Sequence, residues 1–179
     1  GGGGMLLTGV QAFAESANHL ATTAIVDSLM FVHDEVGYNY GLVNVLAALG
    51  CSQLRRLDTY ITRKRAIHDY YESNLRDRGT LKVYKETQCN PNYWLCNVSF
   101  ASEAVRESVL KRLISKGIGA RPLWTPCHRQ PSLRKRSENF GDFQNSDRYW
   151  LSSLSLPSSP SLTDSEVERI VFEITEELN

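Results

Sequence analysis

The pattern of apolar residues changes in the middle of the chain, and this change constrains the fold more than any other feature. Up to Gly79 the sequence predicts helices joined by loops, after one short strand at residues 5–8. Beyond Gly79, apolar segments at residues 81–84, 93–100 and 119–122 alternate with helical patterns, which predicts strands separated by helices. Such alternation is typical of layered α/β structures, so we predict a small α/β domain in this part of the chain.

Two helices of this predicted domain carry start signals. Ser102 is a suitable N-cap for a helix that Gly117 closes. Residues 163–166 form a capping box and precede apolar residues at helical spacing up to Leu178. Residues 126–161 lie between the two helices and are rich in proline, serine and charge. We expect them to form a long irregular connection of the kind that often lines a site.

The first forty residues give weaker signals. Residues 5–8 suggest a short apolar strand after the opening glycines. Residues 11–20 suggest a short amphipathic helix, and residues 22–37 have no clear period. We therefore predict a strand, a helix and a loop in that order.

Two helical segments follow. Residues 42–49 are apolar on most faces, so they form either a buried helix or one side of an interface. A stripe of apolar residues from Leu54 to Leu75, with His68 as a packing residue, predicts one long helix that can bend near Asp58.

The composition argues against several classes of binding partner. The 179 residues include 20 Lys+Arg and 20 Asp+Glu, so the formal net charge is zero and no global electrostatic footprint for nucleic acid or anionic membrane exists. A local basic cluster of Arg129 and residues 134–136 is interpreted as a solvated loop, because no recognition helix accompanies it. No apolar run is long enough to span a membrane. The four cysteines form no C-x-x-C pair, which argues against a metal site and favours reduced thiols in the cytoplasm.

Two clusters of aromatic and polar residues could carry chemistry. In residues 37–40, Asn39 offers two N–H donors just before an apolar helix whose free backbone N–H groups could also meet a phosphate. The alternative for this cluster is a tyrosine-rich turn held by side-chain hydrogen bonds. The second cluster holds Arg121, Trp124 and His128, which could stack on a ring and hydrogen-bond a polar ligand. Its alternative is an ordinary strand end with one buried tryptophan.

At these residues the chain resembles the DegT/StrS family of pyridoxal phosphate (PLP) aminotransferases, which act on nucleotide-linked keto sugars. The resemblance is carried, in family order, by residues 1–8, 35–40, 47–50, 53–58, 156–159 and 162–163. Residues 33–40, 92–95 and 121–124 most resemble the branch that aminates C4 of UDP-4-keto-6-deoxy-N-acetylhexosamines, as in legionaminic acid or bacillosamine biosynthesis.

The resemblance implies the C-terminal part of a type I PLP aminotransferase fold, assembled as a homodimer. Residues 1–57 would be the end of the large PLP-binding domain, and residues 58–179 the linking helix and the small C-terminal α/β domain. The catalytic lysine of such enzymes, which forms the Schiff base with PLP, would precede Gly1. The chain would then contain no catalytic residue, and we expect it to be inactive alone.

The resemblance also assigns binding roles. Asn39 matches the family asparagine that reaches the PLP phosphate of the other subunit, while Arg121, Trp124 and His128 lie where the family lines its sugar-nucleotide pocket. Gly41 departs from the family pattern, which has arginine after Gly-Tyr-Asn-Tyr.

The implied reaction passes an amino group, from glutamate, to the C4 ketone of a nucleotide-linked keto-deoxy sugar, with no metal, nucleic acid or membrane as partner. The alternative is a non-catalytic module that dimerises or binds sugar nucleotides.

Overall fold

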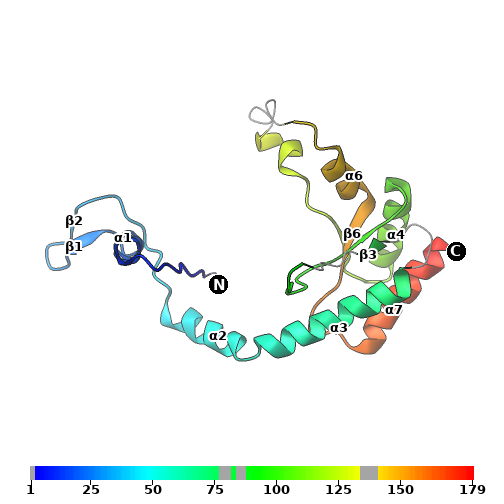
Figure 1. Cartoon of the computed structure of the whole chain (residues 1–179), viewed down its shortest axis with the longest axis horizontal. Helices are drawn as coiled ribbons and strands as arrows, with labels where there is room; N and C mark the ends of the chain where they lie inside the picture. Colours follow the sequence, from blue (N-terminus) through cyan, green and yellow to red (C-terminus); the bar gives the residue numbers. More distant parts are fainter. Residues whose placement is uncertain (1–2, 77–81, 84–87, 134–140) are drawn as a thin grey trace. The chain divides into compact units, whose positions relative to one another are not determined.

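The structure is a computed structural model that describes residues 3–76, 82–83, 88–133 and 141–179. The chain divides into two compact units, residues 1–57 and residues 58–179 (Figure 1). Each unit is described by itself.

The described residues of the first unit form two helices and a two-stranded hairpin. Its elements are α1 (Gln11–Ala21), β1 (Ile25–Asp27), β2 (Val32–His33) and α2 (Asn44–Leu54). The helix predicted at 11–20 is confirmed as α1.

Two predictions for the first unit were wrong. Residues 5–8 form no strand, and no described strand lies beside them to supply hydrogen bonds. The loop predicted at 22–37 contains the antiparallel pair of β1 and β2. A short turn closes this hairpin, because the Asp27 carboxylate accepts from the backbone N–H groups of Leu29 and Met30, each at 2.9 Å.

The first unit has almost no core of its own. Ala24 is the one buried hydrophobic residue among its described residues, and helix α2 contains no buried residue. The sequence left two alternatives for residues 42–49, a buried helix or one side of an interface. Within this unit the helix is not buried. The other alternative, an interface, stays a prediction.

The second unit contains four α-helices and a four-stranded antiparallel sheet among its described residues, with strand order β3-β4-β6-β5. In chain order its elements are α3 (Leu57–Leu75), β3 (Lys82–Val83), β4 (Cys96–Ser99), α4 (Glu103–Ser115), β5 (Arg121–Pro122), the 3-10 turns η1 (Cys127–Arg129) and η2 (Pro131–Leu133), α6 (Gln144–Ser152), β6 (Ser153–Leu156) and α7 (Asp164–Leu178).

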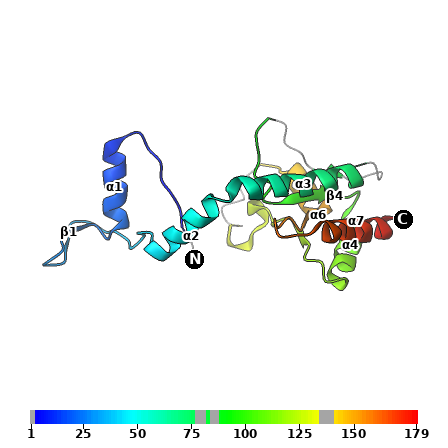
Figure 2. The same cartoon turned by 90° about the horizontal axis from the view of Figure 1, so that it is seen from below.

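One hydrophobic core joins the helices to one face of this sheet. Alternate residues of the two central strands, Cys96 and Val98 on β4 and Leu154 and Leu156 on β6, are buried with side chains from α3, α4 and α7. Helices α4 and α7 lie side by side (Figures 1 and 2). Strand side chains alternate between the two faces of a sheet. Asn97 on β4 and Ser155 on β6 therefore point to the opposite, open face.

The predicted α/β layering is confirmed, with shorter strands than expected. Both helix starts are confirmed: the Ser102 side chain accepts from the Val105 N–H, and Thr163 and Glu166 form the reciprocal capping box. Gly117, with φ of +73°, closes α4 in a conformation that favours glycine. Gly79, Leu81 and Tyr84 lie outside the described residues.

The prediction of a long irregular connection at residues 126–161 was wrong. These residues contain α6 and β6, and β6 is a central strand of the sheet. The alternation Leu154-Ser155-Leu156 is a period-two strand signal that the surrounding serines and prolines obscured. The long helix predicted from the stripe at Leu54 to Leu75 is confirmed as α3, which starts at Leu57, because Arg55 and Arg56 separate it from α2.

Candidate functional site

A hollow of about 770 Å³ lies on the open face of the sheet in the second unit. Across its floor, Asn97 on β4, Ser155 on β6 and Arg121 on β5 are register partners on adjacent strands. The Ser155 hydroxyl donates to the Asn97 amide oxygen at 2.7 Å. The sheet thus presents an amide, a hydroxyl and a guanidinium in one row across three strands.

Two tryptophans also line this hollow. The indole rings of Trp94 and Trp124 have their centroids 5.4 Å apart and are tilted by 46°. Trp124 is exposed, which rules out the buried tryptophan of the alternative interpretation. Tilted pairs of this kind leave ring faces available for another planar group.

The backbone at Trp94 is held from several sides. Its carbonyl accepts from the Ser158 hydroxyl at 2.7 Å and faces Nζ of Lys64 at 3.4 Å. Lys64 itself donates to the Ser158 carbonyl at 2.6 Å. Burial lowers the pKa of this lysine, because charge is less stable away from water. Helix α3 therefore ties the segment before β4 to the segment after β6.

His128 does not line this hollow. In the turn η1, its Nε2 is 2.8 Å from Asp147 Oδ1, and its ring stacks on Phe143 with centroids 5.0 Å apart. Arg129 reaches both oxygens of the same carboxylate, at 3.0 and 2.5 Å. Hydrogen bonds from Arg129 and His128 lower the pKa of Asp147 to about 2, so the group is a carboxylate at neutral pH.

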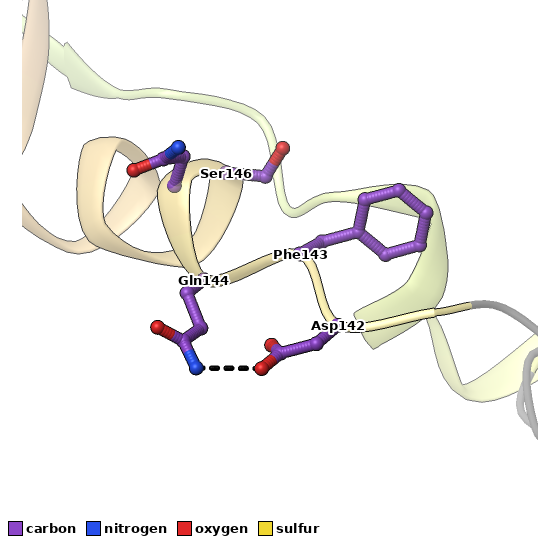
Figure 3. A pocket seen from close by; sticks show the side chains of 5 residues that line it. Asp142, Phe143, Gln144 and Ser146 are labelled. Atoms are coloured by element: carbon purple, nitrogen blue, oxygen red, sulfur yellow. Dashed lines mark hydrogen bonds between the residues drawn. The ribbon is translucent and has the colours of Figure 1, made fainter.

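A smaller hollow of about 360 Å³ lies at the start of α6 (Figure 3). It is lined by residues 142–146, and the Gln144 amide donates to the Asp142 carboxylate at 2.6 Å. The segment thus offers polar side chains on a short turn.

Asn39 lies in the first unit on a backbone that is fixed on both sides. It forms an isolated antiparallel bridge with Thr22, and the flanking Tyr38 and Tyr40 N–H groups donate to carbonyls at the end of α1, at 2.7 and 2.8 Å. Gly37 allows this approach, because a Cβ there would lie 2.5 Å from backbone atoms of Thr23 and Ala24. The Asn39 side chain is exposed, and the Tyr38 and Tyr40 rings stack on each other.

Helix α2 starts at Asn44, close after Asn39 in the sequence, with Val43 as its N-cap and no side-chain cap. A Cβ at Gly41, between Asn39 and α2, would meet no atom within 4 Å. The backbone there has room for a Cβ, and the family pattern has arginine at this position.

Two groups of side chains could hold a metal ion among the described residues, and the sequence analysis expected neither. The first is His19, Asp34 and Glu35 in the first unit, and the second is His68, Asp69 and Glu72 on α3. His19 Nε2 is 2.7 Å from Asp34 Oδ1, and this hydrogen bond lowers the pKa of Asp34. His68 is buried, as the packing interpretation predicted.

Of the four residues that sequence analysis proposed for binding, the structure brings together two. Arg121 and Trp124 line the same hollow, His128 belongs to the Asp147 cluster, and Asn39 is in the first unit. Trp94, Asn97, Ser155 and Asp147 were missed as site residues. Alternation in the strands could have placed Asn97 and Ser155 on the open face, but their pairing required the sheet register.

Two further predictions concern the basic cluster and a membrane span. Arg129 pairs with Asp147, while residues 134–136 of the basic cluster lie outside the described residues. In the part of the chain that the structure describes, no helix combines the length and the apolar character needed to cross a membrane.

The sequence of the chain matches a known protein family and several of its members. Residues 1–175 match the DegT/DnrJ/EryC1/StrS aminotransferase family, and the chain belongs to this family. The GDP-perosamine synthase of Escherichia coli O157:H7 is 30% identical over 177 residues, which cover 98% of this chain and 47% of that protein. The UDP-4-amino-4,6-dideoxy-N-acetyl-beta-L-altrosamine transaminase of Campylobacter jejuni is 26% identical and is covered to 49%.

Solved structures agree on the fold. The aminotransferase TlmJ from Streptoalloteichus hindustanus is 25% identical, with a TM-score of 0.83 over 93% of this chain and 45% of that one. The chain therefore has part of an aminotransferase fold, and it spans about half the length of the curated relatives that it matches.

Proposed function

We propose that the chain is the C-terminal half of a PLP-dependent aminotransferase that transfers an amino group, from glutamate, to the C4 ketone of a nucleotide-linked keto-deoxy sugar. The observation that carries this proposal is the family match over residues 1–175, which includes both the Asn39 segment and the aromatic hollow. Relatives named for GDP-linked and UDP-linked sugars support a sugar nucleotide as the substrate class without choosing the base. Residues 1–57 would complete the large domain, and residues 58–179 would form the small one.

The residues of the first unit suit a contact with the phosphate of PLP. Asn39 presents an exposed neutral amide on a fixed backbone, and a neutral donor binds a phosphate without the cost of burying another charge. In a homodimer with an isologous interface, each subunit would supply this amide to its partner's site. When bound, PLP supplies the electron sink for amino transfer.

The lysine that binds PLP is proposed to lie in the half of the family length that this chain does not span. Residues 1–57 contain no lysine, and Lys64 in the second unit donates to backbone carbonyls. We therefore expect no covalent attachment of PLP to this chain. PLP, borohydride and mass spectrometry test this, and a PLP adduct on Lys64 or Lys116 would contradict it.

The decisive experiment combines two defective subunits of the complete enzyme. An Asn39→Ala subunit is co-expressed with one that lacks the catalytic lysine. If Asn39 acts on the partner's PLP, one site of the heterodimer keeps both groups and substantial activity survives. If Asn39 serves its own subunit, every site with a lysine lacks its asparagine, and the heterodimer shows only the weakened PLP affinity of the Asn39→Ala homodimer. That result would refute the assignment.

The alternative proposal is a non-catalytic module that dimerises or binds sugar nucleotides. The exposed apolar residues of α2 favour association, since a continuous apolar patch in water drives it. Sedimentation of the chain tests the dimer, and a monomer at high micromolar concentration would count against both proposals. The four unpaired cysteines support a cytoplasmic location for either.

A further inference from the structure

The Asn39 segment, which we define as residues 34–40, lies against the end of helix α1 in the first unit. The Tyr38 and Tyr40 N–H groups donate to carbonyls of α1 at 2.7 and 2.8 Å, and Asn39 between them is bridged to Thr22. These contacts all lie at the C-terminal end of the segment. The start of the segment therefore needs contacts of its own if the whole segment is to stay in place.

At the start of the segment, side chains make the contact with α1. His19, in the last turn of α1, has its Nε2 atom 2.7 Å from Asp34 Oδ1 and 3.8 Å from Glu35 Oε1. A carboxylate can only accept a hydrogen bond, so Nε2 carries the proton and donates to Asp34. The backbone bond at this end, from the Asp34 N–H to the Ala24 carbonyl, is longer, at 3.3 Å. The imidazole of His19 therefore ties the start of the segment directly to α1.

The turn that follows α1 is strained. Thr23 and Ala24 have φ of +68° and +52°, a left-handed conformation that is costly for residues other than glycine. Gly37 passes so close to this pair that a Cβ would lie 2.5 Å from their backbone atoms. Such strain persists only where surrounding contacts hold it, and it is found at functional sites. Because the His19 hydrogen bond spans this turn, its loss should let the turn relax and the Asn39 segment move.

We infer that His19 is a positioning residue: through its hydrogen bond to Asp34 it holds the Asn39 segment so that the Asn39 amide meets the phosphate of PLP. The Asn39 side chain is exposed, so its direction depends on the backbone that carries it. That direction matters because a hydrogen bond weakens steeply when the donor is turned away from its acceptor. This inference rests on the proposed function, in which Asn39 contacts the phosphate, and it adds a residue that acts through Asn39.

The first experiment measures amide hydrogen exchange at Tyr38 and Tyr40 in the 179-residue chain, with EDTA present so that no bound cation contributes. His19→Leu removes the donor and should speed exchange at both positions by about fivefold. His19→Gln should exchange like the unaltered chain, because the glutamine amide can also donate to Asp34. Glu15→Leu is the matched control one turn earlier, because it breaks a hydrogen bond that stays within α1, and it should leave the exchange unchanged.

The second experiment measures PLP affinity of the complete enzyme, with and without the Asn39 amide. His19→Leu should weaken PLP about fivefold where Asn39 is present, which is less than the effect of about tenfold or more expected for Asn39→Ala itself. In the Asn39→Ala background the same substitution should change the affinity by less than about twofold, since no amide is left to position. A role in overall stability would instead weaken PLP equally in both backgrounds. Asp34→Ala removes the acceptor and should reproduce these values, so it carries the test if the leucine variant folds poorly.

Three results would overturn the inference: unchanged amide exchange in His19→Leu, equally fast exchange in Glu15→Leu, or equal weakening of PLP in both Asn39 backgrounds. The proposed function fails separately. If Asn39→Ala leaves the PLP affinity unchanged while His19→Leu speeds exchange, the phosphate contact falls and the tie between His19 and the segment stands. If Asn39→Ala weakens PLP and His19→Leu does not, only the role of His19 falls.

Discussion

Replacing Lys64 with methionine should destabilise the second unit by about 2 kcal/mol. Nζ of Lys64 lies 2.6 Å from the Ser158 carbonyl oxygen and 3.4 Å from the carbonyl oxygens of Tyr93 and Trp94. Only the first distance is that of a strong hydrogen bond, and a bond from a charged donor contributes about 1.5 to 3 kcal/mol. Burial opposes the charged form of Lys64 and lowers its pKa, so we take a value in the lower half of this range.

Methionine is chosen because it keeps most of the side-chain volume and leaves no unpaired charge. The assay is urea unfolding at neutral pH. With a slope of about 1.5 to 2 kcal/mol per molar urea, the midpoint should fall by about 1 M. Lys111→Met, on the exposed face of α4, is the control and should change stability by less than about 0.5 kcal/mol. Equal midpoints for the two variants would refute this account of Lys64.

Three further predictions concern single groups. The folded-state pKa of Asp147 is about 2, below its ordinary 3.8, so its stabilising contribution should be present above pH 3.8 and be lost as the pH falls toward 2. A carboxyl NMR titration with a midpoint at the ordinary value would contradict this. Gly37→Ala should speed amide exchange at Tyr38 and Tyr40 at least tenfold, because its Cβ would overlap the backbone at Thr23; unchanged exchange rates would show that the backbone moves aside. Thr163→Ala should cost about 1 kcal/mol in thermal unfolding while Thr163→Ser costs less, since serine keeps the cap of α7; equal losses would count against the capping box.

The helices of the second unit were largely predictable. The starts of α4 and α7 depend on hydrogen bonds between residues three positions apart, such as Thr163 with Glu166. Their buried faces follow from apolar residues at helical spacing. These signals lie within one or two turns of the chain, so they can be read without knowing the fold. The end of α4 was equally local, because Gly117 adopts a positive φ.

The candidate site was only half predictable. Arg121 and Trp124 are close in sequence, so their cluster was visible before the fold was known. Trp94, Asn97 and Ser155 join them through pairing of β4, β5 and β6, and β6 had been assigned to an irregular connection. His128 was expected beside Trp124, but Asp147 on α6 holds it in a separate cluster.

The sequence by itself determined the family, the α/β class of the second unit and the helix boundaries that local caps set. Tertiary structure alone decided that β6 is a central strand, which side chains form the floor of the hollow, and that Lys64 ties the chain around Trp94. The physical reason is the range of the interactions: a cap or a helical stripe is complete within a few residues. Strand register and buried hydrogen bonds instead join groups far apart in the chain, and their energy exists only once the chain has folded.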